Sequence, residues 1–482
     1  MPNPKVSRPV IVWFRQDLRL ADNPALSAAI ATGKPVIAAY ILDDANAGEW
    51  TMGGASRWWL HHSLAALGES LAACGVRLTL REGDPERILR DLIDKTGADT
   101  VVWNRLYEPW ARERDGALKT CLSEMGIQAR SYNGALLREP WTVESKSGGP
   151  YKVFTPYWRA ASDKDADFEL LDPPASITTY VGELTSDSLD DWKLNPSDPD
   201  WAAGFGEVWS PGEAGAADRL AVFVKGGIRG YSERRDIPGE PGTSRLSPHL
   251  HYGEVSPRQV WMALKNACAE GVDADKFRAE LGWREFAHHL LHYFPSLPEE
   301  NFQEKFDRFP WRDDEAGFQA WTRGRTGIPI VDAGMRELWA TGWMHNRVRM
   351  IAGSFLVKNL LISWRRGETW FWDTLVDADL ANNAAGWQWI GGSGADAAPY
   401  FRIFNPVSQG ERFDPDGRYV RHWCPELDAL PNALIHKPWT ASRLELEYAG
   451  IRLGETYPEP IVDLGETRKR ALAAFAQTKD AA

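Results

Sequence analysis

The sequence predicts two folded parts, an N-terminal α/β domain with a doubly wound parallel sheet and an all-α C-terminal domain. Over residues 1–132, short apolar runs alternate with helical segments, as they do when helices join parallel strands. Residues 133–215 are rich in Pro, Gly, Asp and Ser, which is typical of an interdomain linker. From 216 to 482 the strand signal gives way to helical periodicity. A chain of 482 residues is also too long for one ordinary domain.

The elements are predicted in chain order from these patterns. The continuous apolar run at 9–14 is of the buried-strand type, and a turn at 21–24 precedes a helix from about Ala25. Ser256-Pro257 predicts a helix N-cap followed by Pro in the first turn. The remaining predictions are strands at 36–42, 76–80, 100–103 and 127–131, and helices at 56–74, 280–294 and 343–364.

Composition excludes several classes of protein. The net charge of −12 and the pI near 5.4 exclude a uniformly basic nucleic-acid coat, although a local basic face remains compatible. Apolar runs are too short for a membrane span, and the first residues lack the apolar core of a signal peptide, so we expect a cytoplasmic protein without membrane association. The cysteines are far apart and predict reduced thiols; they are Cys74, Cys121, Cys268 and Cys424.

Tryptophan is unusually abundant. The chain has 24 Trp against 18 Phe and 13 Tyr. Most of these indoles are expected in the core, but large rings also stack on planar ligands.

Four stretches combine residues that suit chemistry, each with a structural alternative. The turn at 242–248 offers three hydroxyls and the Arg245 guanidinium, which suit a pyrophosphate, although a solvated loop fits equally well. Residues 376–389 hold two carboxylates, two asparagine amides and two indoles, which suit a ring with N–H groups or an Asx-rich turn before core aromatics. Residues 283–286 and 343–350 mix Arg with aromatics, as in nucleic-acid sites or in helices with snorkelling Arg.

Two other kinds of site are disfavoured. The first strand is followed by Arg15 and Gln16 without a glycine-rich phosphate motif, which argues against an ordinary dinucleotide or ATP site there. His288 and His292 have a zinc-compatible spacing, but His289 stands where a zinc protease has Glu and a third ligand is not evident. We therefore predict no metal site.

Six motifs in order give the chain its resemblance to a known family. They are IVWFRQDLRLADNPAL, GTSRLSPHLHYGEVSPRQ, WREF, TGIPIVDAGMRELWATGWMHNRVRM, FLVKNLLISWRRGE and DADLANNAAGWQW with GADAAPYFRIFNP. In order and spacing they resemble the DNA photolyase/cryptochrome family over nearly the whole chain. The resemblance implies a helical domain that binds FAD.

The resemblance also implies which residues hold FAD. Asp377 and Asp379 face the isoalloxazine and ribitol region, with Arg349 pairing Asp377, and Asn383 lies beside flavin N5. Asn at this position is similar to repair enzymes, whereas plant-type photoreceptors commonly carry Asp and insect ones Cys. The other implied cofactor-binding residues are Tyr231, Thr243, Ser244, Arg245, Leu246, Ser247, Arg284 and Ala378.

The activity implied is light-driven repair of cyclobutane pyrimidine dimers in UV-damaged DNA, by electron transfer from excited reduced FAD to a flipped-out dimer. The matching substrate residues are Glu280, Trp283, Asn346, Arg347, Met350 and Trp389, and a protonated Glu280 is expected to donate a hydrogen bond to a thymine carbonyl. Arg235, Arg347 and Gln409 resemble contacts to the DNA backbone. Trp311, Trp364 and Trp387 match the family's tryptophan chain for photoreduction of FAD.

The type of DNA lesion and the antenna cofactor are predicted from a few individual residues. Asn346 and Met350 look like the cyclobutane-dimer enzymes rather than those for the (6-4) photoproduct. Stretches 53–64 and 107–110 look closest to the class III branch. Trp110 and Ala111 replace the Asn-Glu pair that holds folate in class I, so 5,10-methenyltetrahydrofolate in another pocket is the first choice and 8-hydroxy-5-deazaflavin the second.

Two alternatives to repair remain. One is a cryptochrome-type blue-light photoreceptor, which would typically carry a C-terminal extension that this sequence lacks. The other is a light-independent flavin oxidoreductase. We expect a monomer in either case.

Overall fold

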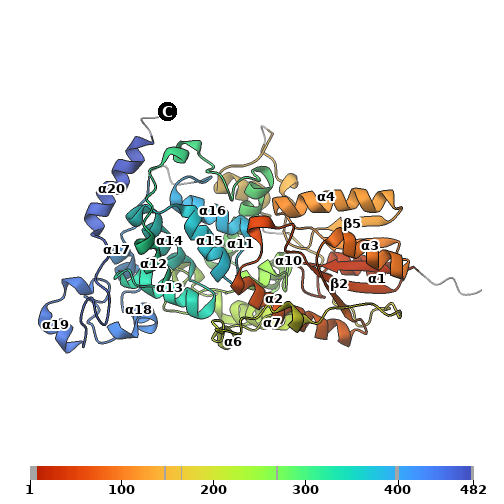
Figure 1. Ribbon diagram of the computed structural model, residues 1–482, viewed down its shortest axis with the longest axis horizontal. Helices are drawn as coiled ribbons and strands as arrows, with labels where there is room; N and C mark the ends of the chain where they lie inside the picture. The colour runs from red at the N-terminus through yellow and green to blue at the C-terminus, as the bar shows by residue number, and fades with distance from the viewer. Residues whose placement is uncertain (1–7, 146–147, 164–165, 268–269, 397–400, 479–482) are drawn as a thin grey trace, which may run out of the picture. The chain divides into compact units, whose positions relative to one another are not determined.

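The computed structural model describes residues 8–145, 148–163, 166–267, 270–396 and 401–478 (Figure 1). The chain forms two compact units. Unit 1 comprises residues 1–151, 157–226 and 244–295, and unit 2 comprises 152–156, 227–243 and 296–482. Residues 397–400 of the last motif, and Cys268, lie outside the described residues.

Unit 1 contains a five-stranded sheet in the order β3-β2-β1-β4-β5, with all strands parallel. Its centre is apolar because every residue of β1 and β2 is buried. The strand order reverses between β1 and β4, as in a doubly wound sheet, which confirms the predicted fold class of this part. The strands are β1 (Val10–Phe14), β2 (Val36–Leu42), β3 (Leu78–Glu82), β4 (Thr100–Asn104) and β5 (Gln128–Tyr132).

The helices between the strands begin at clear sequence signals. The Asn23 side chain accepts a hydrogen bond from the Leu26 amide and caps the first helix, whose first residue is Pro24. Asp84 does the same for the third helix. The four helices are α1 (Pro24–Ala31), α2 (Gly54–Ala73), α3 (Pro85–Thr96) and α4 (Pro109–Glu124).

The linker region contains little regular structure, but it follows the sheet. The Val36 amide at the start of β2 donates to the Thr178 carbonyl at 2.8 Å, and the Asp187 amide donates to Leu80 in β3 at 2.8 Å. Its short helices are α5 (Phe154–Ala161) and α6 (Phe205–Val208).

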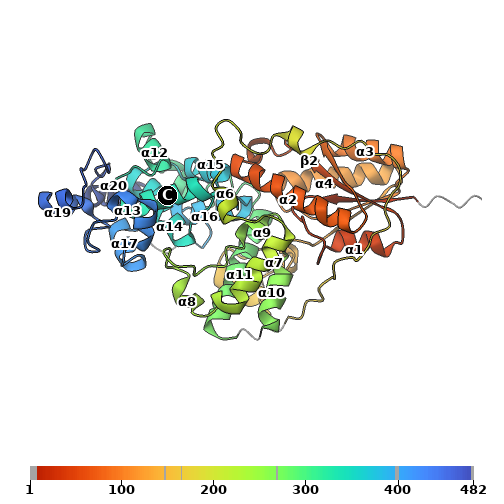
Figure 2. The same ribbon diagram turned by 90° about the horizontal axis from the view of Figure 1, so that it is seen from below.

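The remaining helices of unit 1 form a group of their own (Figure 2). Ser256 and Gln259 form a complete capping box at the start of α10, with Pro257 in the first turn, as predicted. The helices are α7 (Glu213–Val222), α9 (Ser247–His251), α10 (Pro257–Asn266) and α11 (Val272–Tyr293).

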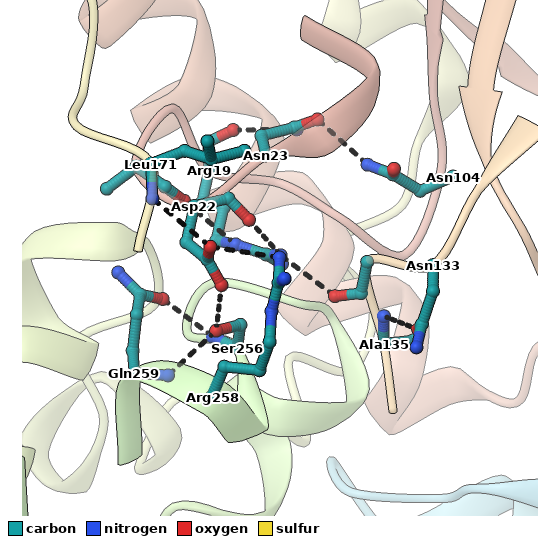
Figure 3. A network of polar contacts seen from close by, with 12 residues as sticks. Arg19, Asp22, Asn23, Asn104, Asn133, Ala135, Leu171, Ser256, Arg258 and Gln259 are labelled. Atoms are coloured by element: carbon teal, nitrogen blue, oxygen red, sulfur yellow. Dashed lines mark hydrogen bonds and ion pairs between the residues drawn. The ribbon is translucent and has the colours of Figure 1, made fainter. Parts of the chain in front are cut away.

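A buried polar network joins the loop after β1 to this helical group (Figure 3). Arg19 is fully buried and donates to four carbonyl oxygens, those of Ala21, Asp22, Gly134 and Gly253, at 2.7–3.0 Å. The Asp22 carboxylate accepts from the Ser256 hydroxyl at 2.5 Å and from Arg258 at 3.0 Å. The sheet and the helices of unit 1 are thus tied together by fully paired polar groups.

Unit 2 is helical in its described residues and packs around one large apolar core. The core includes Trp321, Trp364, Phe371 and Trp387. The helices are α8 (Tyr231–Arg234), α12 (Glu315–Thr322), α13 (Pro329–Thr341), α14 (Asn346–Ser354), α15 (Trp364–Thr374), α16 (Leu380–Gly391), α17 (Pro406–Phe413), α18 (Arg418–Trp423), α19 (Arg443–Tyr448) and α20 (Leu464–Gln477).

The prediction of one continuous helix over 343–364 is wrong. Helix α14 begins at Asn346, widens into a π-helical turn at Phe355–Leu360, and ends where Leu361 takes a left-handed conformation with φ of 56°. A second helix then starts at Trp364, capped by the Ser363 side chain. Apolar periodicity persists through the break because both helices bury residues in the same core.

Among the described residues, no helix is long and apolar enough to cross a bilayer. Cys74, Cys121 and Cys424 are free thiols.

Candidate functional site

Helix α16 carries a carboxylate, an amide and an indole along one side. Asp379, Asn383 and Trp387 are four residues apart, a spacing that puts side chains on one helix face. Asp379 caps the helix, since its Oδ1 accepts from the backbone and side-chain nitrogens of Asn382 at 2.9 and 2.6 Å. The cap fixes the carboxylate relative to the rest of the face.

The Asn383 side chain is held in one orientation by helix α15. Its Nδ2 donates to the backbone carbonyl of Glu368 at 3.0 Å. The Glu368 side chain is 1% exposed, and burial raises the pKa of its carboxyl well above the usual range. Its Oε1 has no hydrogen-bond partner among the described residues. A buried carboxyl with a raised pKa therefore belongs to the helix that orients Asn383.

Arg349 and Asp377 form the ion pair that the resemblance implied. Arg349 Nη2 lies 3.0 and 2.9 Å from the two carboxylate oxygens of Asp377, and its Nε donates to the Met344 carbonyl at 2.7 Å. The Asp377 side chain is 4% exposed. Two anchors fix the guanidinium, so the pair places one cation and one anion beside the start of α16.

The three predicted chain tryptophans range from buried to half-buried. Trp387 is 2% exposed and packs edge-on against Phe371 at 4.9 Å between ring centroids. A Cβ on Gly367 would come within 2.2 Å of the Trp387 ring, so glycine makes room for this indole. Trp364 is fully buried and donates to Asn301 at 2.9 Å, whereas Trp311 is half-buried against the core.

Helix α14 brings together the predicted substrate residues of unit 2. Asn346 is exposed at its first turn, with Met350 one turn later on the same face. Arg347 pairs with Asp236 at 2.7 Å, and its guanidinium lies 4.4 Å from the centre of the Phe413 ring. Trp389 on α16 and Gln409 on α17 are partly buried in the same unit.

Arg235 and Tyr231 belong to the short α8 region of unit 2. The Arg235 guanidinium lies 5.6 Å from the centre of the buried Tyr231 ring, and its Nε lies 3.8 Å from Asp236. Thr243 ends this segment, and a Cβ on the preceding Gly242 would come within 2.4 Å of the Arg234 carbonyl. The glycine therefore allows the close backbone approach that shapes the loop.

Of the other implied residues, Ala378 belongs to unit 2 and the rest belong to unit 1. Ser244 to Leu246 form the loop that leads into α9 at Ser247, as predicted, and Arg245 has a left-handed φ of 51°. On α11, Arg284 donates to the Ala135 carbonyl at 2.7 Å. Trp283 is partly buried on the same helix.

Glu280, also on α11, has an ionic neighbour. Lys276 lies 3.7 Å from its carboxylate one turn earlier, and the Glu280 side chain is 26% exposed. The role of Glu280 as a protonated donor stays a prediction.

The sequence analysis missed two residues that the structure connects to predicted ones. Glu368 was part of a quoted motif, and its spacing of four from Trp364 and three from Phe371 placed it on a buried helix face. Asp236 gave no signal other than following Arg235. Its pairing with Arg347 joins segments 111 residues apart and needed the structure.

The described part of the chain contains no group of three or more His, Cys, Asp or Glu placed to hold a metal ion. His288 instead contacts the Arg284 carbonyl at 2.9 Å through Nδ1.

Two family models match the chain. Residues 10–176 match the model of DNA photolyase, and residues 277–477 match the FAD binding domain of DNA photolyase. The second match covers Asn346, Asp377 and Asn383.

Similar proteins extend over nearly the full chain. A deoxyribodipyrimidine photo-lyase of Agrobacterium fabrum is 57% identical over 98% of this chain and 98% of its own. Cryptochrome-1 of Arabidopsis thaliana is 42% identical over 97% of this chain and 70% of its own. The crystal structure of a class III photolyase from Agrobacterium tumefaciens matches with a TM-score of 0.96 and 56% identity, covering 100% of this chain and 99% of that one.

Proposed function

Because this chain belongs to the DNA photolyase/cryptochrome family, we propose that it is a deoxyribodipyrimidine photo-lyase that uses light to repair cyclobutane pyrimidine dimers in DNA. The family resemblance predicted from the sequence is confirmed. The observation that carries the proposal is the face of α16, where Asp379, Asn383 and Trp387 recur every fourth residue with Asn383 fixed by α15.

The donor set of unit 2 fits a flavin. A flavin dinucleotide needs acceptors for its ring N–H and ribityl hydroxyls and cations for its phosphates. Asp377 and Asp379 supply the carboxylates, and Arg349 supplies a cation fixed by two contacts. Reduced FAD, when bound, supplies light absorption and the electron that opens the cyclobutane ring of the dimer.

The residues of the chain hold and orient the cofactor. Asn383 would offer its amide oxygen next to the flavin ring, because its nitrogen is engaged by the Glu368 carbonyl. An amide brings no titrating proton to that position, which favours a reduced anionic ring. The hydroxyls of Thr243, Ser244 and Ser247 and the Arg245 guanidinium would bind the phosphate side, with Tyr231, Leu246, Arg284 and Ala378 completing the set.

Substrate recognition would combine apolar and polar side chains. Trp283 and Trp389 would replace the stacking lost when the dimer leaves the duplex. Asn346 and Met350 share a face of α14, and Glu280 would donate to a thymine carbonyl. Arg235, Arg347 and Gln409 would contact the DNA backbone.

Other parts of the proposal follow the sequence predictions. Trp387, Trp364 and Trp311 would carry electrons to oxidised FAD; the first two are buried and Trp311 is partly exposed. The antenna would be 5,10-methenyltetrahydrofolate, with 8-hydroxy-5-deazaflavin as the second choice. A doubly wound sheet binds ligands beyond the carboxyl ends of strands such as β1. In this chain Arg15, which directly follows β1, already pairs with Asp115 at 2.8 Å. The protein would act as a cytoplasmic monomer.

The test is repair of a defined lesion. Irradiated oligo(dT) is incubated with the purified flavin-loaded protein under visible light, and recovery of thymine absorbance is measured. We expect recovery only in the light, with loss of dimers confirmed by chromatography. Dimers that persist while a known photolyase removes them would contradict the proposal.

A photoreceptor is the second candidate, because the 42% identity to Arabidopsis Cryptochrome-1 extends over 97% of this chain. The same assay separates the two. Flavin photoreduction without dimer loss would favour a photoreceptor, and pyridine-nucleotide turnover in darkness would instead indicate an oxidoreductase.

A further inference from the structure

The Asp236 carboxylate lies against both predicted DNA-backbone arginines of unit 2. Its Oδ2 lies 2.7 Å from Arg347 Nη2, and its Oδ1 lies 3.8 Å from Arg235 Nε. We call these three residues the Asp236 cluster.

The Asp236 cluster is held in place by the surrounding chain. A turn in which the Ile237 amide donates to the Arg234 carbonyl at 3.0 Å encloses Asp236. Nearby, a Cβ on Gly239 would lie 3.2 Å from the Cβ of Arg418, so the segment is packed against α18. Phe413 supports the Arg347 guanidinium from one side. The carboxylate is therefore presented by rigid backbone rather than by a mobile loop.

The cluster is accessible. The side chains of Arg235, Asp236 and Arg347 are 12%, 28% and 19% exposed. An anion can therefore approach the Arg347 guanidinium, where it meets the Asp236 carboxylate already in place.

We propose that Asp236 is a positioning residue that acts as an internal competitor of DNA phosphate for Arg347 and so limits the affinity of the protein for undamaged DNA. The proposal rests on the proposed function, since it presumes that DNA contacts Arg347. A phosphate that takes the Nη2 donor must displace a carboxylate already 2.7 Å away. The cost of breaking an ion pair of this kind would lower the affinity of Arg347 for DNA phosphate by a factor of up to about five. The benefit is faster release from the undamaged DNA that makes up nearly all of a genome.

The test compares binding of the flavin-loaded full chain to an undamaged duplex and to the same duplex with one thymine dimer, in darkness and across a salt series. Asp236→Asn should bind the undamaged duplex about three- to fivefold more tightly. The slope of log affinity against log salt should steepen by up to about 0.9, the value for one additional phosphate contact. A role limited to supporting the fold would weaken binding and flatten the slope. Asp236→Ser serves as a second neutral variant and is expected to change both quantities in the same direction.

The control for net charge is Glu86→Gln. Glu86 also pairs with an arginine at 2.8 Å, its side chain is 43% exposed, and it lies in unit 1. This variant should leave both binding constants unchanged within twofold. The effect of Asp236→Asn should also disappear when Arg347 is already Ala.

The outcomes separate the two proposals. If wild type repairs the dimer duplex but Asp236→Asn binds undamaged DNA no more tightly, or Glu86→Gln tightens it equally, the role of Asp236 is overturned while photolyase activity stands. If wild type fails to repair, the proposed function is overturned first. Tighter binding that persists in the Arg347→Ala background would assign the effect to general charge and also overturn the role of Asp236.

Discussion

Two buried polar regions of this protein differ in how completely they are paired. In unit 1, each nitrogen of the Arg19 guanidinium donates to at least one carbonyl oxygen. In the α14–α16 region of unit 2, Glu368 Oε1, Trp387 Nε1 and Arg347 Nε are buried without partners among the described residues. Unpaired buried groups are costly and rare in folded proteins. The difference indicates that the first region is completed by its own chain, whereas the second contains buried polar atoms that the described residues leave without hydrogen bonds.

The largest expected effect is the loss of stability when Arg19 is removed from the fully paired region. Arg19→Ala leaves four buried carbonyls without their donor and should lower the free energy of unfolding by about 3–5 kcal/mol. Denaturant unfolding monitored by circular dichroism measures the loss. Arg443→Ala is the control, because that side chain is 91% exposed and should cost less than about 0.5 kcal/mol. If Arg19→Ala and Arg443→Ala lowered the free energy of unfolding equally, the paired region would not be one that stabilises the fold.

An effect of intermediate size is expected for Glu285, a buried carboxyl with one oxygen that accepts no hydrogen bond from the described residues. Burial raises the pKa of Glu285 on α11 to about 7 from 4.5, although Arg284 lies 3.5 Å away. The pKa of Glu285 is higher in the folded state than in the unfolded state. The contribution of Glu285 to the free energy of unfolding is therefore complete below pH 4.5 and is lost as the pH rises through about 7. Glu285→Gln should therefore be more stable than wild type at pH 8 by up to about 3 kcal/mol.

Unfolding midpoints of wild type and Glu285→Gln across pH 4–8 measure this effect. The variant serves as its own reference for the other titrating groups, which both proteins share. A difference between them that does not grow with pH would contradict the assignment to this carboxyl.

A smaller loss of stability is expected at Trp387, together with a change of function. Trp387→Phe should lower stability by about 1–2 kcal/mol, because the lost indole leaves a cavity but no broken hydrogen bond. Photoreduction of oxidised FAD, followed by absorbance under blue light, should slow at least tenfold. Trp321→Phe removes an equally buried indole outside the predicted chain and should leave the rate near that of wild type. Unchanged photoreduction in Trp387→Phe would show that another path dominates.

The smallest effect is expected for an isosteric change at Glu280. If this side chain donates a hydrogen bond from a protonated carboxyl, Glu280→Gln retains a donor and repair should fall less than about twofold. Glu280→Ala removes the donor, and repair should fall about tenfold, which corresponds to one hydrogen bond. Equal large losses in the quantum yield of repair would contradict the donor role.

Helices and strands were easier to predict from the sequence than the pairs that side chains form with one another. The sheet of unit 1 followed from apolar runs, because a buried parallel strand needs little beyond them, and 36–42 was predicted to the residue. The Arg349–Asp377 pair followed from the family resemblance. The break after α14 could not be predicted, because both sides bury apolar residues in one core and Leu361 is not a glycine. Asp236 and Glu368 were missed because their roles depend on partners far along the chain.

The left-handed residue Leu361 has a consequence for how this protein can evolve. Each residue added to an α-helix rotates everything beyond it by about 100°. A residue inserted into the middle of α14 would turn Met350 away from Asn346, but the rotation would be absorbed at Leu361 and would not reach Trp364. Changes of length in α14 can therefore accumulate while Trp364, on the next helix, keeps its alignment.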